Sequence, residues 1–372
     1  MARIRVGVLG CGSVGERHYV PNLAASPYVE LVAVCDTDEA RVARVAERHG
    51  VPRWYTDINT MLVKSEFELL CNLTPMRQHA PLALKAVRAG RHVLNEKPLA
   101  VTLQEADVLL EEAAKRGLLV TAAPNAVLSP TFQAAAAAVT SGEVGKVCAA
   151  HGRYGHSGPH EPWFYKAGGG ALFDLGVYNV VTLTGLLGPA LNVVAIAGVA
   201  VPSRTLRGVE FSVEADDNTT LVLDFGQGVQ AVIQTGFVYP TFPNRGAAYD
   251  DRATIELLGT AGAVNWLGYD WEPHGIELRT EASGRWETRA TDQQGYTWKN
   301  GGSILARCLA EGKRSLMTAE HAYHTLEVML GALESARDGR RVEIKSRFSW
   351  PLMRDTEDAR PQTGSTRTEA GV

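Results

Sequence analysis

The chain has 372 residues, of which 45% are hydrophobic and 21% charged, so wholesale disorder is excluded and two domains are expected. The 37 Lys and Arg residues against 41 Asp and Glu residues give a net charge of −4, and the lack of a long basic block argues against a nucleic-acid partner. No apolar stretch approaches the roughly 20 residues of a membrane span, so no membrane partner is expected. Five scattered cysteines argue against a disulfide framework and, with no apolar leader segment in the sequence, favour the cytoplasm.

The first 125 residues alternate between β-rich runs and helical segments. Strands are predicted at Ile4–Leu9, Leu31–Cys35, Leu69–Leu73, His92–Asn95 and Leu118–Ala122. Helices are predicted at Val14–Ala25, Glu39–His49, Pro81–Ala89 and Leu103–Arg116, the last with a capping box, Thr102-x-x-Glu105. This alternation predicts an α/β domain with a doubly wound parallel sheet over residues 1–123.

The rest of the chain has a different pattern. A helix containing Ala134–Ala138, a strand Val147–Tyr154 and a helix Ala171–Leu187 are followed by long strands from Asn192 to about Ala290 and by two helices, Ser303–Glu311 and Thr318–Arg337. Among the strands, Thr219–Phe225 pairs with Val229–Phe237, and Gly275–Glu281 with Arg285–Ala290. We expect an α+β domain with a large open, mainly antiparallel sheet over residues 124–352, then a disordered tail over 353–372.

Residues 10–15 fit the pattern G-x-G-x-x-G between the first strand and the first helix. In this pattern one glycine permits a tight turn, the next lets backbone approach a pyrophosphate, and the third lets helix and strand pack closely. Asp36 lies 21 residues beyond Gly15. A carboxylate there accepts hydrogen bonds from the ribose hydroxyls and favours NAD over NADP, and the nearby Arg41 weakens this preference. We expect a Rossmann domain that binds NAD, with NADP possible; a plain glycine turn beside a surface Asp is the alternative.

Lys97 lies just beyond the predicted strand His92–Asn95, at the edge where open α/β sheets bind ligands. Pro98 stiffens the turn. On spacing alone, however, a solvated loop lysine is the favoured interpretation of Lys97, and an ordinary helix-entry residue is that of His79.

Together these motifs resemble the glucose–fructose oxidoreductase/inositol dehydrogenase (Gfo/Idh/MocA) family. The resemblance extends from residue 3 to about 346 and includes Glu96-Lys97-Pro98 and a second motif, Gly168–Tyr178. It implies that the open sheet forms a homodimer or homotetramer and that Lys97 reaches both nicotinamide and substrate. The cofactor-binding residues that it implies are Gly10, Gly12, Ser13, Val14, Gly15, Asp36, Thr74, Pro75, His79, Glu96, Lys97 and Asn125.

Asp174 and Tyr178 lie four residues apart on a predicted helix and therefore share one face. The family often carries His at the position of Tyr178 and Asp at that of Val181, so this chain resembles the branch in which tyrosine is the acid/base group, and plain inositol dehydrogenase activity is less expected. We predict that Tyr178 exchanges the hydroxyl proton, that Lys97 stabilises charge on oxygen and lowers the Tyr178 pKa, and that Asp174 orients Lys97 or the substrate. An interior, structural Tyr178 is the alternative.

A carbohydrate-like substrate is expected to contact these three residues together with Arg153, Trp163 and Tyr165, although a structural role is equally open for the last three. The glycines 168–170 would let the loop before the helix bend closely over a ligand. His156, His160 and Glu161 lack a convincing fourth ligand, so no metal site is expected.

The sequence therefore predicts an NAD(P)-dependent oxidoreductase that transfers a hydride between nicotinamide and a secondary alcohol or ketone of a sugar, polyol or sugar derivative. Two alternatives remain: an NAD-dependent, redox-assisted glycoside hydrolase or lyase, and a non-catalytic NAD-responsive binding protein. The presence of Lys97, Asp174 and Tyr178 together argues against the second alternative, because binding needs no acid/base group.

Overall fold

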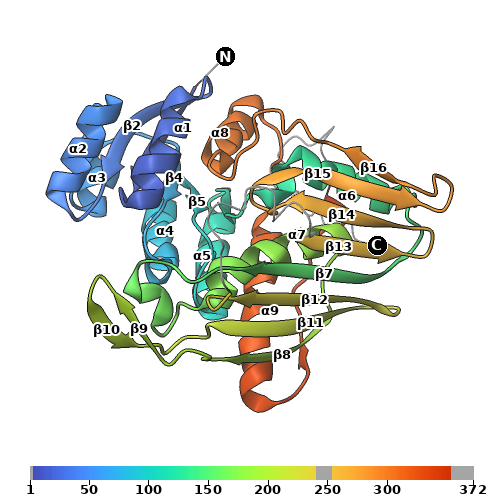
Figure 1. The fold of residues 1–372 in the computed structure, drawn as a ribbon. Helices are drawn as coiled ribbons and strands as arrows, with labels where there is room; N and C mark the ends of the chain where they lie inside the picture. Colours follow the sequence, from blue (N-terminus) through green and yellow to red (C-terminus); the bar gives the residue numbers. More distant parts are fainter. Residues whose placement is uncertain (1–2, 240–253, 353–372) are drawn as a thin grey trace, which may run out of the picture.

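The computed structural model describes residues 3–239 and 254–352. It has two parts side by side: an α/β part that begins at the N-terminus and a larger part built on one broad sheet (Figure 1). Within the described residues, no helix combines the length and apolarity needed to cross a bilayer. The predicted disordered tail, 353–372, lies outside the described residues.

The first part contains a six-stranded sheet in the order β3-β2-β1-β4-β5-β6, in which every neighbouring pair is parallel. The strand order reverses between β1 and β4, and ligands of doubly wound sheets bind beyond the carboxyl ends of strands at such a point. The elements are β1 (Ile4–Leu9), β2 (Val29–Cys35), β3 (Trp54–Tyr55), β4 (Leu69–Asn72), β5 (His92–Asn95), β6 (Val120–Ala122), α1 (Val20–Ala25), α2 (Glu39–His49), α3 (Ile58–Lys64), α4 (His79–Arg88) and α5 (Leu103–Lys115).

The predicted strands and helices of this part are present, with ends shifted by one or two residues. The first helix opens with a π-helical turn, Gly15–Tyr19, before α1. Thr102 caps α5 as predicted, since its hydroxyl accepts a hydrogen bond from the Glu105 N–H at 3.2 Å. The two-residue β3 and the seven-residue α3 were not predicted, because such short segments carry too little periodicity.

The second part contains a nine-stranded sheet in the order β16-β15-β14-β13-β7-β12-β11-β8-β17. All neighbours pair antiparallel except β7 and β12, which are parallel, so the sheet is mixed and mainly antiparallel. Both predicted strand pairs are present, and an unpredicted hairpin of β9 and β10 lies outside the sheet. The elements are α6 (Pro130–Thr140), β7 (Val147–Gly155), α7 (Val177–Leu187), β8 (Asn192–Gly198), β9 (Ser203–Leu206), β10 (Val209–Ser212), β11 (Asn218–Gly226), β12 (Val229–Gly236), β13 (Ile255–Gly259), β14 (Gly262–Gly268), β15 (Pro273–Thr280), β16 (Trp286–Arg289), α8 (Gly301–Glu311), α9 (Ala319–Asp338) and β17 (Val342–Glu343).

The two faces of the nine-stranded sheet differ. Helices α6, α7 and α9 pack on one face, while α8 reaches back to β1 and β2 of the first part (Figure 1). The opposite face, over the residues that the structure describes, carries no helix (Figure 1). Val194, Ile196 and Val222 lie on that face with 45%, 80% and 36% exposure, because the residues that alternate with them in β8 and β11 are buried. A π-helical turn, Leu172–Gly176, leads directly into α7, and its Asp174 meets Lys97, two residues beyond the end of β5.

Candidate active site

The glycine loop after β1 has the geometry of a dinucleotide-binding turn. Gly10 has φ +97°, and a Cβ there would lie 2.7 Å from the Leu73 carbonyl oxygen. A Cβ on Gly15 would lie 2.2 Å from the Gly10 carbonyl oxygen, whereas one on Gly12 would have no heavy atom within 4 Å. The outer two glycines are therefore required by close packing, and the backbone at Gly12 is open to a pyrophosphate, with Ser13 and Val14 exposed beside it.

Asp36 connects this loop to the end of β2. Its Oδ2 accepts a hydrogen bond from the Cys11 N–H at 2.7 Å, and its Oδ1 accepts from Asp38 N at 2.9 Å and from Arg41 Nη1 at 3.1 Å. The Asp36 carboxylate is buried, and its position beside the loop fits a group that accepts ribose hydroxyls. Arg41 offsets part of its negative charge, which weakens the repulsion of a 2′-phosphate.

A buried polar network ties the ends of β4 and β5 together. The Asn72 amide donates to Asn95 Oδ1 at 2.9 Å, and the Asn95 amide donates to the Leu99 carbonyl at 3.0 Å. His79 lies 2.7 Å from two carbonyl oxygens, that of Pro98 through Nδ1 and that of Thr74 through Nε2. These bonds fix the loops that carry Thr74-Pro75 and Lys97-Pro98 relative to each other.

The structure corrects the prediction that His79 lines the cofactor. Its side chain is 1% exposed and both ring nitrogens face backbone carbonyls. Burial lowers the His79 pKa, whereas the contacts with the Pro98 and Thr74 carbonyls raise it. His79 therefore acts on the site through the backbone of Thr74 and Pro98.

Glu96 and Asn125 also form hydrogen bonds with other parts of the protein. Glu96 Oε1 accepts from the Tyr19 hydroxyl at 2.7 Å and Oε2 from the Lys97 N–H at 3.1 Å, which joins the glycine-loop helix to the β5 end. The Asn125 amide, 1% exposed, donates to the Thr297 carbonyl at 3.1 Å. Asn125 thus fixes the segment that leads into α8 rather than presenting its amide to a ligand.

Lys97 lies two residues beyond β5, and it meets Asp174 of the π-helical turn Leu172–Gly176 and Tyr178 of α7 in space. Lys97 Nζ forms a short ion pair with Asp174 Oδ1, donates to the Asp174 carbonyl at 2.8 Å and lies 5.4 Å from the centre of the Tyr178 ring. The Lys97 and Asp174 side chains retain only 13% and 10% exposure. A cation and a phenol are therefore held together at the carboxyl edge of the first sheet.

The predicted direction of the Tyr178 pKa shift is wrong for this structure. Burial raises the pKa of the phenol well above its usual value, and the nearby Glu96, Tyr154, Asp174 and Asp270 raise it further. Lys97 points its charge at Asp174, and within the described residues the Tyr178 hydroxyl has no hydrogen-bond partner. Tyr178 is therefore protonated at neutral pH.

The glycines before this helix bend closely over protein groups, not over an open space. A Cβ on Gly168 would lie 2.9 Å from Arg77 Nε, and one on Gly170 would lie 2.2 Å from Asp216 Oδ1. Asp216 accepts from the Leu172 N–H at 3.0 Å and so caps the helix that carries Asp174 and Tyr178. Arg77, from the first part, donates to the carbonyl of Ala167, so this loop also joins the two parts.

In the described part of the chain, Lys97 makes no hydrogen bond or ring contact with any of the three additional substrate candidates. Arg153 is exposed on β7, on the opposite face of the strand from Tyr154. Tyr165 is 1% exposed and donates its hydroxyl to the Pro159 carbonyl at 2.9 Å, so it is a core residue. Trp163 is 39% exposed and stacks on Phe164 with ring centres 3.7 Å apart.

The structure instead adds two residues of β7 and the segment after it to the site. The Tyr154 ring lies 6.0 Å from the Tyr178 ring, edge to face. His156 Nδ1 accepts from the Gly158 N–H at 2.9 Å, so the neutral ring carries its proton on Nε2. Burial lowers the His156 pKa, while Asp174 raises it and Lys97 lowers it, which places the imidazole near both charges.

Two further residues, Tyr269 and Trp271, come from the β14–β15 turn, with Tyr269 5.0 Å and Trp271 6.4 Å from Tyr154 between ring centres. The only local sign of them in the sequence is that Tyr269 and Trp271 flank Asp270 directly after Gly268. Strand pairing across more than a hundred residues brings this turn to β7 and was not predictable.

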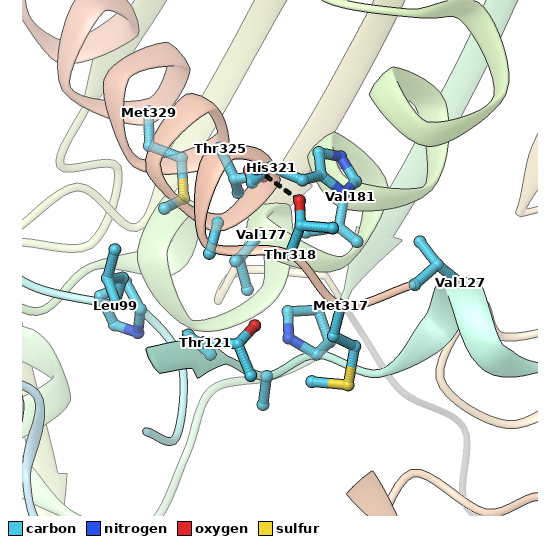
Figure 2. A pocket seen from close by; sticks show the side chains of 15 residues that line it. Leu99, Thr121, Val127, Val177, Val181, Met317, Thr318, His321, Thr325 and Met329 are labelled. Carbon is cyan, nitrogen blue, oxygen red and sulfur yellow. Dashed lines mark hydrogen bonds between the residues drawn. The ribbon is translucent and has the colours of Figure 1, made fainter. Parts of the chain in front are cut away.

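The back of the helix is packed on the protein core. Val177 and Val181 line a cavity of about 20 Å³ with Thr121 of β6 and His321 of α9 (Figure 2). Such a cavity holds about one water, and the buried Thr121 hydroxyl has no protein partner there. The cavity is too small for a sugar.

Comparison with known proteins agrees with this geometry. A family model described as "Oxidoreductase family, NAD-binding Rossmann fold" matches residues 4–123, and one described as "GFO/IDH/MocA C-terminal domain" matches residues 132–265. A dTDP-3,4-didehydro-2,6-dideoxy-alpha-D-glucose 3-reductase of Streptomyces violaceoruber is 31% identical over 264 residues, 70% of this chain and 72% of that protein. The chain belongs to the Gfo/Idh/MocA family.

This Gfo/Idh/MocA protein is an NAD-binding oxidoreductase of a family of sugar and polyol dehydrogenases. A scyllo-inositol 2-dehydrogenase (NAD(+)) of Bacillus subtilis is 24% identical over 348 residues, which cover 92% of this chain and 96% of that one. The structure of an oxidoreductase from Agrobacterium radiobacter in complex with NAD+, L-tartaric acid and magnesium matches with a TM-score of 0.75 at 18% identity, over 92% of this chain and 99% of that chain. That match shows a common fold.

Proposed function

We propose that this Gfo/Idh/MocA protein interconverts a secondary alcohol and a ketone on a sugar, polyol or sugar derivative, with Lys97, Asp174 and Tyr178 as its catalytic residues. The observation that supports this most directly is the Lys97–Asp174 ion pair beside the Tyr178 phenol at the carboxyl edge of the Rossmann sheet. NAD, when bound, supplies the hydride acceptor, and NADH the donor. Gly12, Asp36 and the end of β5 have the geometry to hold it.

Each residue has a separate part in moving the proton. Because Tyr178 is protonated at neutral pH, it is ready to donate its proton to a carbonyl oxygen in the direction of reduction. Lys97 donates a charged hydrogen bond to the same oxygen and stabilises negative charge on it. Asp174 holds the Lys97 ammonium in place.

In the direction of oxidation, Tyr178 must first lose its proton in order to accept that of the substrate hydroxyl. Burial and the neighbouring carboxylates disfavour phenolate, so the rate of alcohol oxidation should rise with pH over the alkaline range, by up to about tenfold per pH unit. The charges of Asp174 and Lys97 act on the His156 pKa, and the neutral ring, with its proton on Nε2, offers a further hydrogen-bond donor to a substrate.

A panel of sugars, cyclitols and open-chain polyols, incubated with NAD and separately with NADP, tests the proposal. Nicotinamide absorbance and product formation are followed together, with a Lys97→Ala variant as the control. We expect reduction of NAD in preference to NADP with at least one compound, and roughly a hundredfold or greater loss in the variant. If wild type and variant reduce NAD at equal rates, or if no compound leads to reduction of NAD, the proposed reaction and its catalytic residues are contradicted.

We also propose that the outer face of the nine-stranded sheet joins copies of the chain into a homodimer or homotetramer. The exposed apolar Val194, Ile196 and Val222 on adjacent strands β8 and β11 support this. Ile196→Glu should lower the mass measured by light scattering, and a wild-type mass of 40.1 kDa, that of one chain, would contradict it. A cytoplasmic location is proposed from the five cysteines, all of which are free thiols, and cell fractionation tests it.

A further inference from the structure

The turn between β14 and β15 presents two stacked aromatic rings beside the site. The Tyr269 and Trp271 rings lie 5.3 Å apart with an angle of 18° between their planes. Tyr154 packs on Tyr269 at 5.0 Å and meets Tyr178 at 6.0 Å. Tyr178, Tyr154, Tyr269 and Trp271 therefore form a continuous row of rings, which we call the aromatic wall.

The aromatic wall continues toward the nucleotide-binding part. Trp271 meets Trp298 at 6.2 Å, and Trp298 meets His18, in the helix after the glycine loop, at 4.7 Å. The carbonyl of Thr297, next to Trp298, is held by the Asn125 amide at 3.1 Å. A substrate held over the nicotinamide by the proposed catalytic residues thus has the wall beside it.

The turn that carries the rings is fixed from both sides. Asp270, between the two aromatic residues, is 1% exposed and accepts a hydrogen bond from the Asn179 amide at 2.9 Å. Asn179 directly follows Tyr178 in the chain. The Tyr269 carbonyl accepts from the Trp266 indole N–H at 3.3 Å. Gly268 has φ +75°, and a Cβ there would lie 2.7 Å from the Glu272 carbonyl oxygen. The rings are therefore held in a set orientation relative to the catalytic helix.

A rigid aromatic surface selects ligands by shape. A six-membered sugar or cyclitol ring has a C–H face that packs flat on an aromatic ring, while an open-chain polyol has no such face and loses more rotational freedom when it is bound. Both Tyr269 and Trp271 keep part of their surface exposed, so they can make this contact. Neither carries a charge that would require an ionic substrate.

We propose that Tyr269 and Trp271 are specificity-determining residues that pack against the C–H face of a ring-shaped substrate and select cyclic polyols or sugars over open-chain polyols. This inference rests on the proposed function. Myo-inositol and 1,5-anhydroglucitol serve as ring probes, and D-sorbitol and D-mannitol as open-chain probes. We expect higher kcat/KM for a ring compound, a roughly tenfold rise in its KM in Trp271→Ala with kcat changed less, and recovery in Trp271→Phe.

Trp286→Ala is the matched control, because Trp286 is a 42% exposed tryptophan on β16, away from the turn. Saturation-transfer NMR on the NADH-bound protein supplies a readout independent of turnover: ring C–H protons of myo-inositol should receive saturation in the wild type and lose it in Trp271→Ala. If alcohols are oxidised but Trp271→Ala changes ring and open-chain probes equally, or if only open-chain probes react, the inference fails while the proposed function survives. If no alcohol is oxidised and no ring probe binds, both fail.

Discussion

The ion pair between Lys97 and Asp174 predicts a particular pattern of stability changes. Since the side chains are only 13% and 10% exposed, removing one charge leaves the other nearly without water. Breaking a buried pair in this way typically costs about 3–5 kcal/mol of unfolding free energy. A shift in the pKa of the remaining group relieves part of that cost, so we expect about 2–4 kcal/mol for Lys97→Met.

The partner substitution and the double variant complete the cycle. Asp174→Asn leaves Lys97 with an amide oxygen and with the main-chain carbonyl at 2.8 Å, so about 1–3 kcal/mol is expected. The double variant contains neither charge. Its loss of stability should therefore fall short of the sum of the single losses by about 1–3 kcal/mol.

Urea unfolding of the NAD-free protein, followed by fluorescence and circular dichroism, measures these differences. The exposed pair Lys166–Glu214, with N and O 2.8 Å apart and 40% and 48% exposure, is the control, since Lys166→Met and Glu214→Gln should each change stability by less than about 1 kcal/mol without coupling. Additive losses in the Lys97 and Asp174 cycle would refute the buried ion pair.

Three further substitutions test the cofactor site and a buried carboxyl. Gly12→Ala should leave stability within about 1 kcal/mol, because its Cβ meets no atom within 4 Å, yet weaken NAD binding at least about tenfold; equal affinity in a fluorescence titration would contradict the loop assignment. Asp36→Ala should lower the NAD-to-NADP ratio of kcat/KM about tenfold or more by freeing Arg41, and an unchanged ratio would refute that role. Burial raises the Asp270 pKa to about 7. Between about pH 4 and pH 7 the folded protein therefore keeps a proton on Asp270 that the unfolded chain has already released. The unfolding free energy consequently falls as the pH rises over this range. Asp270→Asn should abolish this pH dependence, and at alkaline pH the variant should be more stable than the wild type by on the order of 2–4 kcal/mol. Urea unfolding at a series of pH values measures this, and equal pH dependence in the two proteins would contradict it.

The parts of the fold that the sequence predicted are those with local signals. The Gly10–Gly15 loop, the strand ends at Asp36 and Lys97, and the helix with Asp174 and Tyr178 each follow from a few neighbouring residues. The sequence also allowed the orientation of Arg153 to be predicted, because neighbouring residues of a strand point to opposite faces and Tyr154 points to the other face of β7.

The rest of the site depends on contacts between distant segments. Asp270 meets Asn179 across 91 positions, and Tyr269 and Trp271 reach Tyr154 only through strand pairing in the large sheet. No periodicity or spacing in the sequence encodes such neighbours.

The Tyr178 pKa was mispredicted for a related reason. Reasoning from the motif included the charge of Lys97 but neither the burial of the phenol nor the carboxylates of Glu96 and Asp270, which come from other elements. Similarly, His79 was expected at the ligand surface, whereas the fold uses it to hold two backbone carbonyls.

Tyr178→Phe tests the central claim most directly. The change removes a hydroxyl without a hydrogen-bond partner in the described residues and keeps the ring that packs on Tyr154 and Lys97. We therefore expect stability and NADH affinity to remain close to wild type while kcat for the preferred alcohol falls by about 10²–10⁴-fold. A Phe variant that turns over at the wild-type rate would show that the proton is carried by another group.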